Sequence, residues 1–339
     1  MRAVEIRGGF GLDHLETVER PDPSPGPGQA LVRLRAASLN YRDLLTVEGK
    51  YNPKLKLPLI PCSDGAGEVV ATGDGVTRVR PGDRVCGIFA QAWIAGEPTR
   101  ERLRSTLGGP LDGTLAELAV YDQEGLVRIP EHLTDEEAAT LPCAGVTAWT
   151  CLQGITAGDT VLLQGTGGVS IFALQLARLR GARVILTSSS DEKLARAREL
   201  GGPGPEILGI NYRETADWGA RAKELTGGTG VDLVVEVGGA GTLKQSLHAV
   251  RMGGTISLIG NLAGNTAEIP LPLIFMQNVR VQGILVGPRD SFEALNRAIT
   301  LHDLRPVVDR VFPLAEVRAA FEHMAAGGHF GKIVVRIAA

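Results

Sequence analysis

Cysteine and histidine are scarce in this 339-residue sequence, and neither occurs in a spaced set. The four cysteines stand singly at Cys62, Cys86, Cys143 and Cys151. Because no two of them form a C-x-x-C pair, the sequence argues against a disulfide framework and a cysteine-rich zinc site. The six histidines are scattered, so we expect each on the surface or in the core. A reduced, cytoplasmic protein is the resulting expectation.

The sequence also has no large excess of charge of either sign and no long apolar run. The net charge of −3 provides no field that would favour nucleic acid or an anionic membrane surface. No apolar run approaches the length that crosses a bilayer, and the first residues have no signal-peptide core. What remains is a chain with 44% hydrophobic residues and 44 glycines, long enough for one large or two medium domains.

The most informative stretch is a short apolar segment followed by glycines. Residues 160–164 are apolar and partly β-branched, which is typical of a buried strand. The glycines that follow are Gly165, Gly167 and Gly168. Residues 168–180 then show a helical apolar pattern that starts at Val169, and Ser170 takes the last glycine position of a G-x-G-x-x-G pattern. This sequence predicts a dinucleotide-binding unit, in which the backbone approaches a pyrophosphate at a helix N-terminus.

Two patterns divide the chain. Residues 1–127 are typical of β-rich structure with frequent turns, whereas strands and helices alternate over residues 128–287. We expect strands near 160–165, 183–188, 207–211, 231–237, 254–260 and 280–286. We expect helices at 168–180, 191–200, 215–226 and 241–250. Six strands with crossover helices predict an α/β domain with a doubly wound parallel sheet.

The segment 288–339 has a different composition. Two amphipathic helices are expected there, with apolar faces formed by Phe292, Leu295 and Ile299 and by Val317, Ala320, Phe321 and Met324. Residues 331–337 resemble a strand, and we expect this strand to return to the first domain because no partner strand is evident nearby. Earlier in the chain, Thr134 with Glu137 predicts a capping box at a helix start.

Several short motifs occur in a fixed order along the chain. They lie at residues 40–43, 64–70, 79–85, 144–148, 165–169, 210–213 and 329–332. In this order they resemble the medium-chain dehydrogenase/reductase superfamily, and within it the zinc-free quinone oxidoreductase-like branch, often labelled zinc-type alcohol dehydrogenase. The resemblance implies a GroES-like β-rich catalytic domain (1–127, completed by 288–339) and a Rossmann NADP-binding domain (128–287).

The resemblance also bears on zinc. Zinc-using relatives take their catalytic ligands from a Cys, a His followed by Glu, and a later Cys or Asp. Here Asn40 stands at the first position, Ser63 and Asp64 stand at the second, and only Cys143 matches. One thiolate without an imidazole cannot supply three protein ligands, so we expect no metal.

Without a Lewis acid, charge on a substrate oxygen has to be met by hydrogen-bond donors, and protonation has to come from a side chain or water. In zinc-free relatives a tyrosine in a Gly-x-Tyr segment is a proposed proton donor, and Tyr51 matches it. Its other interpretation is a tyrosine that covers the mouth of a cleft. The resemblance implies that Asn40 contacts substrate or the nicotinamide ribose, with packing as the alternative. Asp43 is expected to hold its loop through local hydrogen bonds.

The end of the second Rossmann strand decides between nicotinamide cofactors. NAD-selective domains carry an acidic residue there, which binds the ribose 2′-hydroxyl. The corresponding residue here is Ser188, followed by Ser189. Lys193 and Tyr212 match residues that hold the 2′-phosphate in zinc-free relatives, so the resemblance implies NADP (NADPH). The alternative is a helix N-cap serine cluster with a surface lysine, and two acidic residues nearby count against a phosphate.

The resemblance adds further cofactor contacts to the glycine turn. They would come from Gly165, Gly167, Gly168, Val169, Thr147, Gly238, Asn261 and Val286, with Lys332 reaching a phosphate. Each glycine could equally be a turn at a strand end.

Three functions are compatible with this sequence. The first is an NADPH-dependent oxidoreductase that transfers hydride to a quinone or an (α,β-unsaturated) carbonyl substrate without a catalytic metal. The second is an NAD(P)-dependent alcohol dehydrogenase, and the third is a non-catalytic NADPH-binding structural protein. Relatives are usually dimers, and the apolar segment 279–285 would be the sheet edge that a homodimer covers.

Overall fold

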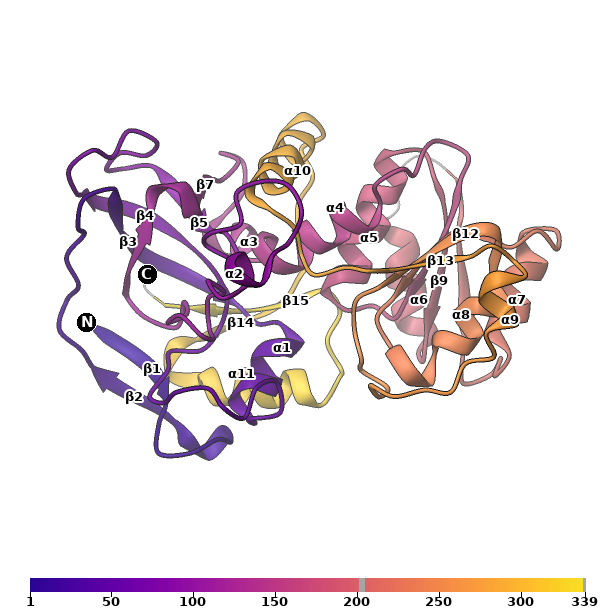
Figure 1. The fold of residues 1–339 in the computed structure, drawn as a ribbon, viewed down its shortest axis with the longest axis horizontal. Coiled ribbons are helices and arrows are strands. Elements are labelled where there is room, and N and C mark those ends of the chain that lie inside the picture. Colours follow the sequence, from indigo (N-terminus) through magenta and orange to yellow (C-terminus); the bar gives the residue numbers. More distant parts are fainter. Residues whose placement is uncertain (201–204, 338–339) are drawn as a thin grey trace. The chain divides into compact units, whose positions relative to one another are not determined.

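The structure is a computed structural model that describes residues 1–200 and 205–337, and it divides into two compact units (Figure 1). Unit 1 comprises Met1–Val146 together with the chain from Val286 onward, and unit 2 comprises Thr147–Leu285. The sequence-based boundaries, at residues 127 and 288, differ from this division mainly at the first crossing.

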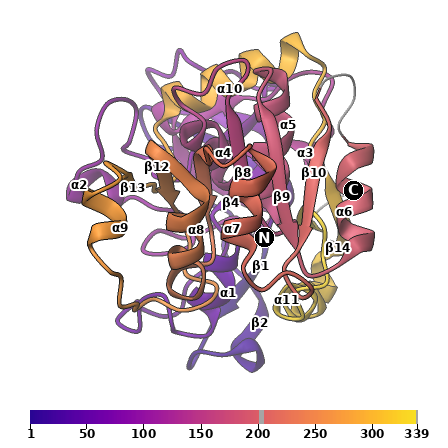
Figure 2. The ribbon, with the colours of Figure 1, turned by 90° about the vertical axis from the view of Figure 1, so that its right-hand side faces the viewer.

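Unit 2 is built on a parallel sheet. Its strands are β8 (Thr160–Gln164), β9 (Arg183–Ser188), β10 (Ile207–Asn211), β11 (Val231–Glu236), β12 (Val250–Leu258) and β13 (Arg280–Gly283). They form six parallel strands in the order β10-β9-β8-β11-β12-β13 (Figure 2). The helices are α4 (Val146–Cys151), which begins in unit 1, α5 (Gly168–Leu179), α6 (Asp191–Glu199), α7 (Trp218–Leu225), α8 (Leu243–Ala249) and α9 (Pro272–Phe275), with a 3₁₀ turn at Gly239–Gly241. This is the doubly wound arrangement, so the predicted sheet is confirmed.

Burial explains why these strands are apolar throughout. All five residues of β8 are buried, because a parallel sheet with helices on both faces has no solvated side. Leu162 and Val234 belong to one buried apolar cluster with Trp218 of α7 and Leu247 of α8.

Unit 1 is mainly antiparallel. Its strands are β1 (Arg2–Ile6), β2 (Leu15–Glu19), β3 (Gln29–Ser38), β4 (Asp64–Thr72), β5 (Arg84–Gly87), β6 (Leu118–Asp122), β7 (Leu126–Arg128), β14 (Val308–Pro313) and β15 (Lys332–Arg336). Its helices are α1 (Tyr41–Val47), α2 (Arg100–Leu103), α3 (Asp135–Ala138), α10 (Arg289–Leu301) and α11 (Val317–Ala325). Shorter helical turns lie at Leu12–His14, Gln123–Gly125, Leu141–Gly145 and Leu314–Glu316. The large sheet runs β14-β15-β3-β4-β5-β7 with β6 paired to β3, and β1 pairs with β2.

The last strand returns to the first part of the chain, as predicted. β15 pairs antiparallel with β3, and Val334 lies opposite Ser38. The expectation that no partner strand lies nearby was wrong, because β14 pairs in parallel with β15. Two charged residues, Asp309 and Arg310, interrupt the apolar pattern of β14 and hide it in the sequence. The return brings Lys332 to the end of β3.

The helices of unit 1 agree with their sequence signals. Thr134 accepts a hydrogen bond from the Glu137 N–H at 3.2 Å, and the Glu137 carboxylate accepts one from the Thr134 N–H at 2.9 Å. This capping box opens α3, which contacts β3, β4 and β15, so the connector after residue 127 belongs to unit 1. The predicted apolar faces of α10 and α11 are buried. Within the described parts of the chain, no helix has the length and apolar character that a bilayer crossing requires.

Candidate active site

The predicted residue Asn40 lies between the end of β3 and the start of α1. Its backbone N–H donates to the Asp43 carboxylate at 2.8 Å, which satisfies a free donor at the helix start. The local role predicted for Asp43 is therefore confirmed. The side chain of Asn40 points elsewhere and is only 8% exposed.

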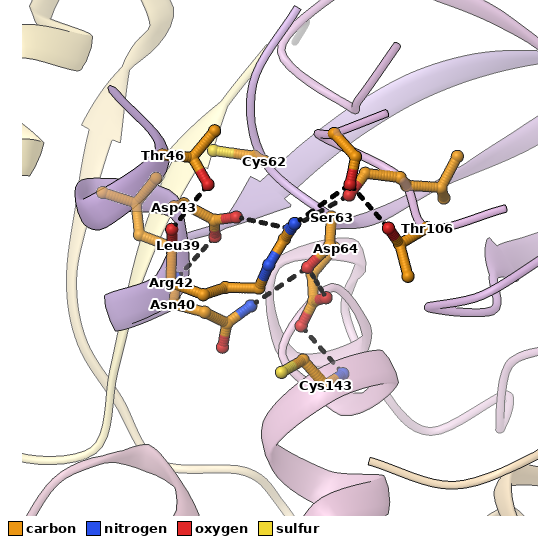
Figure 3. Close-up of polar contacts among 12 residues, drawn as sticks. Leu39, Asn40, Arg42, Asp43, Thr46, Cys62, Ser63, Asp64, Thr106 and Cys143 are labelled. Atoms are coloured by element: carbon orange, nitrogen blue, oxygen red, sulfur yellow. Dashed lines mark hydrogen bonds and ion pairs between the residues drawn. The ribbon is translucent and has the colours of Figure 1, made fainter. Parts of the chain in front are cut away.

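A chain of hydrogen bonds runs through Asn40. The Lys332 ammonium donates to the Leu39 carbonyl at 2.6 Å and to Asn40 Oδ1 at 2.5 Å. Asn40 Nδ2 donates to Ser63 Oγ at 3.4 Å, and Ser63 Oγ donates to Asp64 Oδ1 at 2.6 Å (Figure 3). The Cys143 N–H donates to the other carboxylate oxygen of Asp64 at 3.0 Å. Residues from four separate parts of unit 1 therefore meet in one buried polar cluster.

Burial controls the ionisation of this cluster. Burial raises the pKa of Asp43 to about 6, against the opposing charge of Arg42, and the nearby Asp64 adds to the rise. Burial also raises the pKa of Asp64, and Lys332 opposes that rise. Burial, helped by Asp64, raises the pKa of the Cys143 thiol far above its usual range, so this thiol stays protonated and is a poor nucleophile.

These residues do not fit a zinc ion. The cluster offers an amide, a hydroxyl, one carboxylate and one protonated thiol, with no imidazole, whereas zinc sites use thiolate, imidazole and carboxylate ligands. The Lys332 ammonium already occupies the amide oxygen. Within residues 1–200 and 205–337, no group of three or more His, Cys, Asp and Glu side chains could hold a metal ion.

Tyr51, the predicted proton donor, is not part of the hydrogen-bonded cluster around Asn40, but it contacts Arg42 next to that cluster. The Arg42 guanidinium carbon lies 5.0 Å from the centre of the Tyr51 ring and 5.1 Å from that of Phe89. Arg42 is held by Asp43 at 3.1 Å and by the Leu107 carbonyl at 3.0 Å (Figure 3). Tyr51 itself is 46% exposed. Sequence analysis missed Arg42, although its position inside the Asn-x-x-Asp motif was a visible signal.

In unit 2 the glycine turn has the geometry that a pyrophosphate requires. Gly165 has a φ of +69°, a conformation that favours glycine, and Gly167 precedes the first residue of α5. A Cβ added at either glycine would meet nothing within 4 Å, so the space beside the helix N-terminus is open. Ser170 replaces the last glycine without strain, because its hydroxyl donates to the Gln164 carbonyl at 2.6 Å. These residues fit a dinucleotide.

The residues expected to select NADP lie close together. Tyr212 follows β10 directly, and its N–H donates to the Ser188 carbonyl at the end of β9 at 3.0 Å. Ser188 is buried, and its hydroxyl accepts from the Ser190 N–H at 3.3 Å. Ser190 in turn caps α6 by accepting the Lys193 N–H at 3.3 Å. The structure therefore shows one of these serines, Ser190, as the N-cap of α6. This cap leaves the exposed Tyr212 side chain available for contact with a phosphate.

A buried carboxylate that the sequence analysis overlooked shapes the end of β11. Glu236 has no exposed surface and accepts from the Gly238 N–H at 2.8 Å and the Gly239 N–H at 2.9 Å. Its carboxylate also accepts from Thr242, Gln164 and Ser246. The predicted contact Gly238 is thereby fixed in place. An acidic residue at the end of an apolar strand, two positions before a pair of glycines, was the available signal.

The remaining predicted residues are spread over both units. Thr147 is buried in α4, and Asn261 is exposed after β12. Val286, at the start of the second segment of unit 1, is buried and has a φ of +54°. The structure thus brings Asn40 and Lys332 together in unit 1, and Gly165 to Val169 together in unit 2.

Comparisons with known proteins agree with this architecture. Residues 26–131 match the alcohol dehydrogenase GroES-like domain, and residues 168–300 match the zinc-binding dehydrogenase domain. A zinc-type alcohol dehydrogenase-like protein of Schizosaccharomyces pombe is 42% identical over 337 residues, which cover 96% of each chain. The crystal structure of an NAD-dependent alcohol dehydrogenase superposes with a TM-score of 0.90 at 33% identity, with 100% of each chain covered.

Relatives that act on thioesters are also similar. An acryloyl-coenzyme A reductase of Metallosphaera sedula is 29% identical over 99% of each chain. A GroES-like domain and a doubly wound parallel sheet in one chain define a class of oxidoreductases, and the chain belongs to the medium-chain dehydrogenase/reductase family within it. The resemblance stated from the motifs is confirmed.

Proposed function

We propose that this protein is an NADPH-dependent reductase that acts on a quinone or an α,β-unsaturated carbonyl compound without a catalytic metal. The observation that carries the proposal is the end of β9. There Ser188 stands where an acidic residue would select NAD, and Tyr212 lies beside it.

Charge supports the preference for NADP. A carboxylate at Ser188 would repel a 2′-phosphate, and the serine hydroxyl brings no such charge. Asp191 and Glu192 are close in sequence, but both are exposed at the start of α6. Because solvent screens exposed charges, they oppose a phosphate only weakly.

In the proposed reaction the bound cofactor, NADPH, supplies the hydride, and residues of this protein supply the proton and position the groups around it. Tyr51 is the proposed proton donor: its phenol oxygen gives a proton to the reduced substrate, and solvent restores it through the exposed face of the ring. The Arg42 guanidinium packs over that ring, and Lys332 and Ser63 hold the amide of Asn40.

Similar proteins support the substrate class. The acryloyl-coenzyme A reductase named above acts, by its name, on an α,β-unsaturated thioester. The structure of a crotonyl-CoA carboxylase/reductase in complex with NADP superposes with a TM-score of 0.85 at 25% identity, covering 99% of this chain and 94% of the other. We infer an acceptor whose double bond is conjugated to a carbonyl group.

A second function is favoured by one comparison. The superposed alcohol dehydrogenase with 33% identity is NAD-dependent by its name. An NAD(P)-dependent alcohol dehydrogenase is therefore the alternative.

A fluorescence titration with NADPH and NADH tests the cofactor. We expect NADPH to bind at least about ten-fold more tightly, which corresponds to about 1.4 kcal/mol. Ser188→Asp should weaken NADPH binding, whereas Ser24→Asp, which adds the same charge at an exposed loop position, should not. Equal affinity for the two cofactors would overturn the preference for NADP.

Turnover separates the two functions. NADPH oxidation is followed with quinones, enones and enoyl thioesters, and NADP⁺ reduction is followed with primary and secondary alcohols. Faster turnover of alcohols than of every conjugated acceptor would favour the alcohol dehydrogenase.

A further inference from the structure

We propose that the Lys332 ammonium is the permanent counter-charge of the polar cluster around Asn40. It offsets the charge of Asp64 and orients the Asn40 amide, and it prevents a divalent metal ion from binding in the cluster. The effect on turnover rests on the proposed reductase function, whereas the charge balance and the metal exclusion do not.

Lys332 is unusual because its ammonium is buried. The residue is 4% exposed, and long charged side chains are almost never buried unless they are paired. Its position is imposed by the fold, since Lys332 begins β15 and β15 pairs with β3. The side chain therefore reaches the end of β3, where it meets the Leu39 carbonyl and Asn40 Oδ1.

The buried charges of this region balance. Asp43 and Asp64 are fully buried, and the two cations beside them are Arg42 and Lys332. Arg42 pairs directly with Asp43 at 3.1 Å. Among the described residues Asp64 has no such direct pair: it accepts from the Ser63 hydroxyl and the Cys143 N–H. Burial raises its pKa, and Lys332 is the cation that opposes this rise. Removing Lys332 would leave Asp64 as a buried carboxylate without a counter-charge.

The Lys332 ammonium and the Asp64 carboxylate, at the two ends of the hydrogen-bonded series, fix the direction of every hydrogen bond between them. An ammonium only donates, and an ionised carboxylate only accepts. Asn40 therefore turns Oδ1 towards Lys332 and Nδ2 towards Ser63, and the Ser63 hydroxyl donates to Asp64. Lys332 thus acts on the reaction through Asn40, as a positioning residue.

The same contact explains why a metal is excluded. The amide oxygen of Asn40 is the acceptor that a cation would use, and the Lys332 ammonium holds it at 2.5 Å. A divalent cation at this place would meet a fixed positive charge within a buried, low-dielectric region, where like charges repel strongly.

A double-mutant cycle tests the charge balance. The variants are Lys332→Met, Asp64→Asn and the double variant, with Lys244→Met on the exposed side of α8 as the matched lysine control. We expect Lys332→Met to lower the midpoint of denaturant unfolding clearly and the double variant to recover most of that loss, because both buried charges are then gone. Additive losses from the two single changes would overturn the charge balance.

Turnover in the double variant tests the positioning role. With its fold recovered but Asn40 no longer oriented, we expect kcat to stay at least ten-fold below that of the unchanged protein, with a smaller change in KM. Full recovery of kcat together with stability would refute positioning and reduce Lys332 to a structural counter-charge.

Metal content provides a readout that needs no activity. The unchanged protein is incubated with excess Zn²⁺, desalted and analysed for bound metal. We expect well below one zinc per chain, and one tightly held zinc per chain would overturn the exclusion of metal. A protein that binds NADPH but reduces no carbonyl compound would defeat the proposed function, while the unfolding cycle and the metal content would still decide the role of Lys332.

Discussion

Asp43 couples its ionisation to folding, because its carboxyl is buried beside Asp64 as well as Arg42. Burial raises the pKa of Asp43 to about 6, compared with about 4 in an unfolded chain. Between these two values the folded protein holds a proton that the unfolded chain releases, so rising pH favours unfolding. Since one pKa unit is worth about 1.4 kcal/mol and the unfolded chain has already lost about half of this proton at pH 4, the group should lower the free energy of unfolding by about 2 kcal/mol between pH 4 and pH 7.

Denaturant unfolding of Asp43→Asn across this range isolates the effect. The stability of the unchanged protein relative to the variant should fall from pH 4 to pH 7. Asp83→Asn is a control of opposite sign: burial raises the pKa of Asp83, but hydrogen bonds from the Arg80 N–H and Arg128 outweigh it and lower that pKa. Parallel profiles for Asp43→Asn and the unchanged protein would contradict the prediction.

Tyr51 is the second residue whose role can be isolated. Removing its hydroxyl with Tyr51→Phe should lower kcat about 100-fold, the lower range for general acid catalysis, while KM changes little. Steady-state kinetics with NADPH and a conjugated acceptor measure this. Tyr41→Phe is the matched control, because Tyr41 is similarly exposed, at 40%, and lies in the same helix–loop segment. An unchanged kcat in Tyr51→Phe would favour the interpretation of Tyr51 as a cover.

At the scale of elements, a substitution in the turn between β8 and α5 should impair cofactor binding without impairing folding. Gly167 has an ordinary backbone conformation, and an added Cβ would meet nothing, so Gly167→Val should change the free energy of unfolding by less than about 1 kcal/mol. The same side chain would occupy the space that a pyrophosphate needs. We therefore expect the Kd for NADPH to rise at least about ten-fold.

Fluorescence titration and denaturant unfolding of the same preparation check this prediction. Gly328→Val is the control, because Gly328 is exposed and an added Cβ there also meets nothing. Retained NADPH affinity in Gly167→Val would place the dinucleotide elsewhere.

At the scale of the whole molecule, the edge of the parallel sheet predicts association. β13 is the last strand of the sheet, and all four of its residues are exposed. Val281 within β13 is an exposed apolar residue, and so are Phe275, Met276 and Leu285, which lie within five residues of the strand in the sequence. An uncovered edge with such side chains invites pairing with a second copy, so we predict a two-fold dimer.

Light scattering after size exclusion measures the assembly. We expect twice the 35.8 kDa chain mass, and a shift to one chain in the variant Met276→Asp with Val281→Lys. Leu301→Asp, at a residue that is 78% exposed at the end of α10, should leave the mass unchanged. A single-chain mass for the unchanged protein would exclude the dimer.

Much of unit 2 could be predicted from the sequence because its signals are local. The buried strand β8, the glycine turn and α5 follow one another within 20 residues, and each has its own periodicity. The capping box at Thr134 and the apolar faces of α10 and α11 were predictable for the same reason. The strand β14 was not, because its pairing with β15 depends on a distant segment and not on its own composition.

The amino-acid sequence by itself determined the residue types at the site: an amide, a hydroxyl and a carboxylate where a metal would need imidazole and thiolate, and a serine where NAD would need an acid. Only the tertiary structure decided what these residues do to one another. Lys332 contacts Asn40 from 292 positions away, and Arg42 contacts the rings of both Tyr51 and Phe89. Such contacts depend on strand pairing across the whole of unit 1, and burial there, which no local pattern encodes, sets the ionisation of Asp43 and Asp64.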